Sequence, residues 1–65
     1  MNIKRNIVLK DEPEIYHVNH VYESALYAAK ATDISAGIHI LEIGLSNWPD
    51  VRDREIEKLR KEMGN

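Results

Sequence analysis

The sequence predicts a single, mostly α-helical domain of three helices, at about residues 12–31, 34–46 and 48–63, with an extended or short-strand segment at 2–10. Apolar residues recur at intervals of three and four along the helical segments, which is the period of one helix face. Residues typical of helix ends separate the segments. A chain of 65 residues, 43% hydrophobic and 31% charged, has the size and composition of one small domain, residues 1–65.

The first helix is predicted from a start signal and an apolar stripe. Asp11 and Glu14 form a D-x-x-E capping box, and Pro13 fits the first turn, where its missing N–H would have no partner. At about 100° per residue, one face of the helix then collects a row of apolar side chains. These are Ile15, Val18, Tyr22, Ala25, Leu26 and Ala29. We expect this face to contact the core.

The middle segment is interpreted as a helix, with a buried strand as the alternative. Its apolar residues repeat at helical intervals of four, three and four positions: Ile34, Ile38, Leu41 and Leu45. Asp33 or Ser35 would cap this helix. The β-branched content of the segment is also typical of a buried strand. The alternative fold is therefore an α+β domain with strands near 3–9 and 38–43.

As a helix, the middle segment would be apolar on both faces, because Ala36, Ile40 and Ile43 lie opposite the first stripe. One face can pack on the other two helices, and the second needs another cover. A domain of this size is marginally stable by itself, and the chain has no cysteine to form a disulfide. We therefore expect a homodimer. Its predicted interface contains Ile38, Ile40, Leu41, Ile43 and Leu45.

The last helix is predicted between an Asn47 cap, with Pro49 in the first turn, and Gly64 at its end. Its apolar stripe is thin and consists of Trp48, Val51, Ile56, Leu59 and Met63. Most of the other positions are charged. We expect the carboxylates of this helix to form a solvated face.

The chain carries no motif that predicts catalysis or a cofactor. It has no Gly-x-Ser-x-Gly turn, no glycine-rich phosphate loop and no cysteine nucleophile, so we expect no enzyme activity and no bound cofactor. His17 and His20, with Glu23 nearby, could in principle ligate zinc or nickel. Because no third ligand stands in register, we interpret both histidines as solvated helix positions and predict no metal site.

The predicted function is that of a non-catalytic regulatory protein that binds another protein. Tyr16, His20, Glu23 and Tyr27 follow one another at intervals of four, three and four, opposite the core stripe. Tyrosine contributes a large contact area at low entropic cost, so this face suits a partner protein. The alternative is that the N-terminal segment or a second protomer packs over it. In size and composition, the chain resembles accessory proteins of phages and mobile elements.

The apolar runs of the sequence are short. None approaches the ~20 residues that span a bilayer, and the N-terminus lacks the long apolar stretch of a signal peptide. We therefore expect a cytoplasmic protein that does not enter a membrane.

Basic residues are concentrated at the N-terminus. Lys4, Arg5 and Lys10 stand in residues 1–10 without an acid, and the rest of the chain carries six basic against eleven acidic residues, a charge of −5. This asymmetry permits a local phosphate contact by the N-terminal segment, but it argues against a nucleic-acid footprint over the whole domain.

A dimeric DNA-binding regulator is the alternative function. A basic segment followed by two helices is similar to the ribbon-helix-helix class, and the likeness spans residues 3–46. The resemblance implies that paired strands of a dimer enter the major groove, with Lys4, Asn6 and Val8 facing it. The first predicted helix is longer than in that class, and the body is acidic. The candidate DNA contacts are Lys4, Arg5, Asn6 and Lys10.

Overall fold

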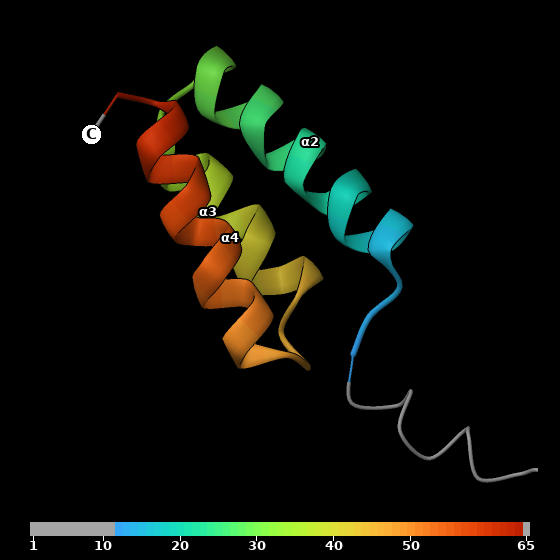
Figure 1. Cartoon of the computed structure of the whole chain (residues 1–65). Helices are drawn as coiled ribbons and strands as arrows, with labels where there is room; N and C mark the ends of the chain where they lie inside the picture. The colour runs from blue at the N-terminus through green and yellow to red at the C-terminus, as the bar shows by residue number, and fades with distance from the viewer. Residues whose placement is uncertain (1–11, 65) are drawn as a thin grey trace, which may run out of the picture.

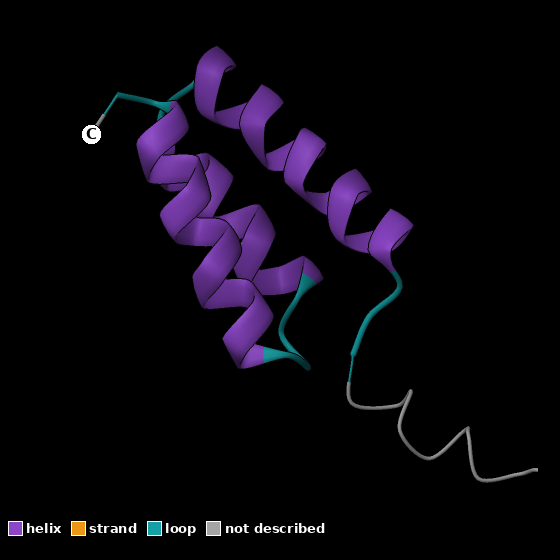
Figure 2. Cartoon of the chain, viewed as in Figure 1, coloured by secondary structure: helices purple, strands orange, loops and turns teal. Residues whose placement is uncertain are grey.

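Three helices make up the part of the chain that the computed structural model describes, residues 12–64 (Figure 1). With the labels of Figure 1, α2 spans Ile15–Ala31, α3 spans Ile34–Gly44 and α4 spans Pro49–Glu62. The most extensive contact joins α2 to α3, and α4 packs mainly on α3. Within residues 12–64, the segments between the helices are loops and turns, and there is no strand (Figure 2).

The predicted three-helix domain is confirmed, and the α+β alternative is wrong for its second strand. Residues 38–43 lie inside α3, because the helical spacing of the apolar side chains lets this segment bury one stripe against two neighbouring helices. The predicted segment at 2–10, and the alternative strand near 3–9, lie outside the described residues.

The first helix begins later than predicted. α2 starts at Ile15 instead of residue 12, and Glu14 is its N-cap, with φ −71° and ψ 148°. The Glu14 carbonyl accepts hydrogen bonds from the backbone N–H groups of His17 and Val18, at 3.0 and 3.1 Å, while its side chain makes no capping bond. Pro13 disfavours helical geometry at the residue before it, which accounts for the absence of helix at Glu12. Asp11, the predicted cap, lies outside the described residues.

The other helix ends partly follow the prediction. The Asp33 carboxylate accepts a hydrogen bond from the Ala36 backbone N–H at 3.1 Å, so Asp33 caps α3 as expected. α3 ends at Gly44 and not at residue 46. Trp48, and not Asn47, is the N-cap of α4, because Pro49 takes the first helical position. Gly64 follows α4 with a φ of +92°, the left-handed geometry predicted for it.

The core lies where the three helices meet. Its buried members are Val21, Tyr22, Ala25, Ala29, Leu41, Leu45 and Leu59. Leu41, Leu45 and Leu59 are the largest side chains that are fully buried, and they come from α3, the turn that follows it, and α4. Ile15 departs from the prediction, since its side chain is 75% exposed. It opens the helix, at a point where α2 and α4 leave a pocket between them.

Two glycines of α3 set the close approach of α3 to α2. A Cβ on Gly37 would lie 2.6 Å from the Ala25 carbonyl oxygen and 2.8 Å from Leu59 Cδ2. A Cβ on Gly44 would lie 2.7 Å from Val21 Cγ1. Neither glycine has a positive φ, so space and not backbone conformation makes them necessary. The backbone of α2 therefore packs directly on α3.

Replacing Gly37 by alanine should destabilise the domain. The new methyl group would meet the Ala25 carbonyl, a backbone atom that cannot move without displacing α2. Overpacking of this kind costs about 1–3 kcal/mol, more than the gain of about 1 kcal/mol from better helix propensity. Thermal and urea unfolding of Gly37→Ala measure the effect. Ser35→Ala, an exposed change in the same helix, is the control and should unfold close to wild type. A Gly37→Ala variant that is as stable as wild type would contradict this account of the contact.

Candidate partner-binding surfaces

The tyrosine face, defined as Tyr16, His20, Glu23 and Tyr27, lies on the side of α2 that points away from the core. All four residues are exposed, and the two tyrosine side chains are 74% and 76% exposed. The tyrosines are eleven positions apart, which corresponds to about 16 Å along the helix. The structure thus brings the four predicted partner-binding residues onto one open surface.

The residues predicted for a dimer interface divide into two groups. Leu41 and Leu45 are fully buried in the core of the chain itself, so a second copy cannot reach them without disturbing it. Ile43 is 64% exposed, and Ile38 and Ile40 are half-buried. The side of α3 that remains accessible, the α3 outer face, consists of Ala36, His39, Ile40 and Ile43.

The two histidines of α2 differ in their surroundings. His17 is half-buried, its Nε2 donates to the Gly44 carbonyl oxygen at 3.1 Å, and its ring meets that of Trp48 edge-on, with centroids 6.0 Å apart. His17 is therefore a link between the start of α2 and the end of α3, and not the solvated position that was predicted. His20 is exposed as predicted. Residues 12–64 contain no group of three or more His, Asp or Glu side chains that could hold a metal ion.

A small charged cluster lies where α4 meets α2. Lys58 Nζ lies 4.4 Å from the centroid of the Tyr22 ring and 3.5 Å from Glu55 Oε1. Burial raises the pKa of the Tyr22 hydroxyl, and the negative charges of Glu62, Glu55 and Glu23 raise it further. Tyr22 thus keeps its proton at alkaline pH where an exposed tyrosine would lose it.

The burial of Glu55 was not predicted from the sequence. Instead of joining a solvated face, it is 7% exposed and ranks with the core residues in burial. The spacing contains the signal, because Val51, Glu55 and Leu59 follow one another at four-residue intervals on the apolar stripe of α4. An acidic residue in the middle of such a stripe is a candidate for burial.

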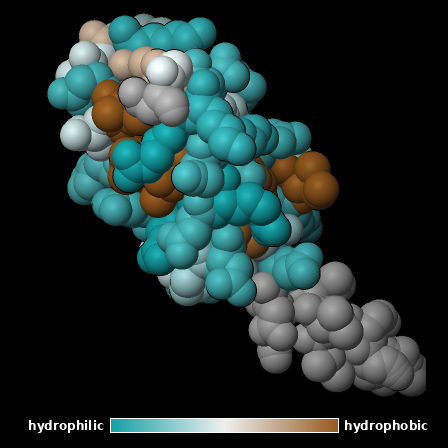
Figure 3. Space-filling model, turned by 60° about the vertical axis from the view of Figure 1, so that its left-hand side comes forward, coloured by the Kyte–Doolittle hydropathy of each residue, from teal (hydrophilic) through white to brown (hydrophobic). Residues whose placement is uncertain are grey.

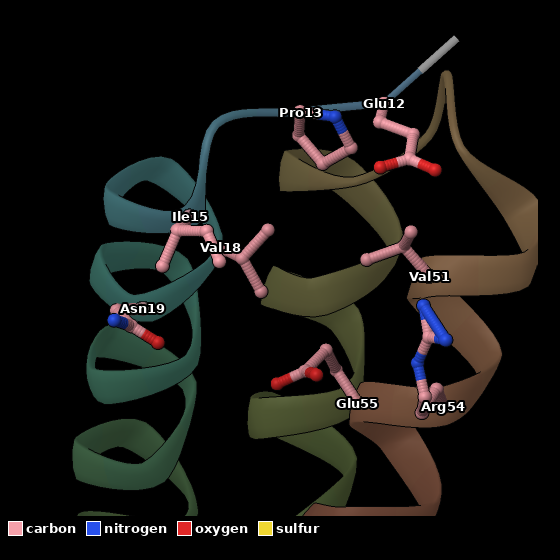
Figure 4. Close-up of a pocket in the computed structure, with 8 residues that line it drawn as sticks. All are labelled: Glu12, Pro13, Ile15, Val18, Asn19, Val51, Arg54 and Glu55. Carbon is pink, nitrogen blue, oxygen red and sulfur yellow. The ribbon is translucent and has the colours of Figure 1, made fainter.

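The α2–α4 pocket lies between the first turns of these two helices and has a volume of about 270 Å³ (Figure 4). Its lining residues are Glu12, Pro13, Ile15, Val18, Asn19, Val51, Arg54 and Glu55. Figure 4 shows the Glu55 carboxylate directed from α4 toward α2, whereas the Arg54 guanidinium extends along α4 toward Val51. The pocket therefore combines apolar walls with one buried carboxylate.

Elsewhere the surface is mostly polar. On the face shown in Figure 3, hydrophilic residues predominate and hydrophobic ones emerge in separate places between them. None of the helices within residues 12–64 has the length and apolar character needed to cross a membrane.

The candidate DNA contacts, Lys4, Arg5, Asn6 and Lys10, lie outside the described residues, so their arrangement adds nothing to the ribbon-helix-helix interpretation. Comparison with protein-family models, with curated proteins and with solved structures gives no significant match to this chain. The candidate surfaces therefore have to be interpreted from their own geometry and chemistry.

The raised pKa of Tyr22 predicts a loss of stability at high pH. Below a pH near 10, both the folded and the unfolded chain keep this proton, and the full stability is present. As the pH rises further, the unfolded tyrosine ionises first, so the free energy of unfolding falls through the folded-state pKa. Urea unfolding between about pH 9 and 11 should show a steeper fall for wild type than for Tyr22→Phe. Tyr16→Phe, at an exposed position, should retain the steep fall. Parallel profiles for wild type and Tyr22→Phe would contradict the assignment.

Proposed function

We propose that this chain is a non-catalytic interaction protein that self-associates through the α3 outer face and binds a second protein through the tyrosine face. The observation that carries the proposal is the pair of tyrosines on α2, both about three-quarters exposed and on one side of the helix. The two surfaces belong to different helices. A dimer could therefore use one while it presents the other.

The tyrosine face has the chemistry of a contact with a partner protein. Single exposed aromatic residues are ordinary on protein surfaces, but here two are aligned, with His20 and Glu23 between them. Tyrosine is enriched at interfaces because its ring buries a large area while its hydroxyl stays hydrogen-bonded. An elongated surface of about 16 Å suits a groove or a second helix as the partner structure.

Self-association is supported by the exposure of the α3 outer face. The inner face of α3 is occupied by α2 and α4, so Ile43 is the large apolar side chain that α3 presents outward, while Ile40 beside it is half-buried and packs partly on the core. Covering Ile43, 64% exposed here, would remove apolar surface from water. In a two-fold contact centred on this face, Ile43 of one copy would lie near Ile43 of the other. A substitution at Ile43 would then change the interface twice.

Capture of a partner tests the tyrosine face. Full-length protein immobilised on beads should retain a specific protein from an extract of its native host, and Tyr16→Ala/Tyr27→Ala should lose it. Both side chains are exposed, so the double variant should unfold like wild type. Lys61→Ala, an exposed change on α4 and therefore off the tyrosine face, is the control and should capture normally. If the double variant retains every protein that wild type retains, the tyrosine face is not the binding surface.

Mass in solution tests the α3 outer face. Wild type should sediment as a dimer at micromolar concentration, and Ile43→Glu should shift the equilibrium to monomer, because the contact would bring two like charges together near the symmetry axis. Ser46→Glu adds the same charge at an exposed position beyond α3 and should remain dimeric. A wild-type protein that stays monomeric at high concentration would refute self-association while leaving the tyrosine face open to its own test.

A further inference from the structure

The α2–α4 pocket is lined by an unusual group, the buried carboxylate of Glu55, whose Oε1 has no hydrogen-bond donor among residues 12–64. Glu55 is 7% exposed, and its Oε1 accepts no hydrogen bond from any residue within 12–64. The nearest cation within residues 12–64, Lys58 Nζ, lies 3.5 Å away, which is longer than the 2.7–3.2 Å typical of an N–H···O bond. A buried carboxylate in this condition costs free energy that a suitable donor would recover.

Both helices contribute apolar side chains to the lining of the pocket. Ile15 and Val18 contribute from α2, and Val51 contributes from α4 (Figure 4). Ile15 has most of its side chain in contact with solvent in spite of its apolar character. The volume of about 270 Å³ is roughly nine times the share of one water molecule in the liquid, so several non-hydrogen atoms can enter.

We propose that the α2–α4 pocket binds a primary ammonium group on an alkyl chain, with Glu55 as the carboxylate that receives it. The ammonium supplies N–H donors and a positive charge to Glu55, and such charge-assisted bonds are the stronger ones. The methylene groups cover Ile15, Val18 and Val51. This chemistry is shared by a free alkylamine and by a lysine side chain of a polypeptide.

The charges of the lining favour a cation. Among the lining residues within 12–64, Glu12 and Glu55 are acidic and Arg54 alone is basic, so these residues together carry a net negative charge. The Arg54 guanidinium extends along α4 toward Val51 and away from the Glu55 carboxylate (Figure 4). An anionic ligand would therefore meet a buried negative charge, whereas an ammonium would neutralise it.

Lys58 competes weakly with the ligand for Glu55. Its ammonium is also 4.4 Å from the Tyr22 ring, and its side chain is half exposed, so it is shared between Tyr22, Glu55 and water. Removing this cation should strengthen binding of an external ammonium, while neutralising Glu55 should abolish it. These opposite responses separate a site at Glu55 from a general effect of charge on α4.

The test is a titration with n-butylammonium, followed by NMR of the methyl groups of Ile15, Val18 and Val51 in the full chain. We expect saturable shifts in wild type, binding at least about tenfold weaker in Glu55→Gln, and binding severalfold tighter in Lys58→Gln. Glu57→Gln removes the same charge from an exposed position on α4 and should bind like wild type. Butyrate and n-butanol, which lack the ammonium, should give no saturable shift.

Two further arms identify the source of the ammonium and separate this site from the tyrosine face. A blocked Gly-Lys-Gly peptide that binds more tightly than n-butylammonium indicates a lysine of a polypeptide, and the reverse order indicates a free amine. If saturable shifts appear in Lys4→Gln/Lys10→Gln but not in wild type, a lysine of the chain itself already fills the pocket in wild type. That result supports the same ammonium chemistry. Tyr16→Ala/Tyr27→Ala should leave the titration unchanged. Absence of saturable shifts in both wild type and Lys4→Gln/Lys10→Gln, or equal binding by Glu55→Gln, overturns the proposal.

Discussion

The backbone of α2 lies against α3 at Gly37, where a side chain of any other residue would meet the Ala25 carbonyl. Two turns later, the missing side chain of Gly44 makes room for the side chain of Val21. Helices that touch through small residues approach more closely than helices separated by large side chains. Leu59 of α4 reaches the same place, so one contact fixes the position of all three helices.

This close contact decides which side chains are left outside. Once α3 turns Gly37, Leu41 and Gly44 toward its neighbours, Ile43 must face outward, because about 200° of rotation separates it from Leu41. On α2, packing through Val21 and Ala25 directs Tyr16 and Tyr27 to the opposite side in the same way. The candidate surfaces are therefore the geometric consequence of the core.

Much of the fold, and the tyrosine face, follow from local features of the sequence, whereas the α2–α4 pocket does not. The Asp33 cap and the helical spacing of Ile34, Ile38 and Leu41 are sufficient to predict α3, since each acts within a few residues. The exposure of Ile15 depends on where α2 and α4 separate, which no local pattern specifies. The spacing of Glu55 from Val51 and Leu59 marks it as a candidate for burial, but its place in a pocket beside α2 depends on the same packing. His17 likewise looked like a solvated position, because its partner, the Gly44 carbonyl, lies 27 residues away.

Glu55 is a charged residue that is buried, and Ile15 is an apolar residue that is exposed, the reverse of what is usual for each type. Both line the same pocket. A buried carboxylate oxygen with no donor among residues 12–64 lowers the stability of a small domain, and an apolar side chain left in water adds nothing to that stability. A single ligand with a cationic end and an alkyl stem would correct both defects at once, since the donor and the apolar cover would arrive together. The ion pair with Lys58, at 3.5 Å, leaves Oε1 of Glu55 without a short donor among residues 12–64, and it does nothing to cover Ile15.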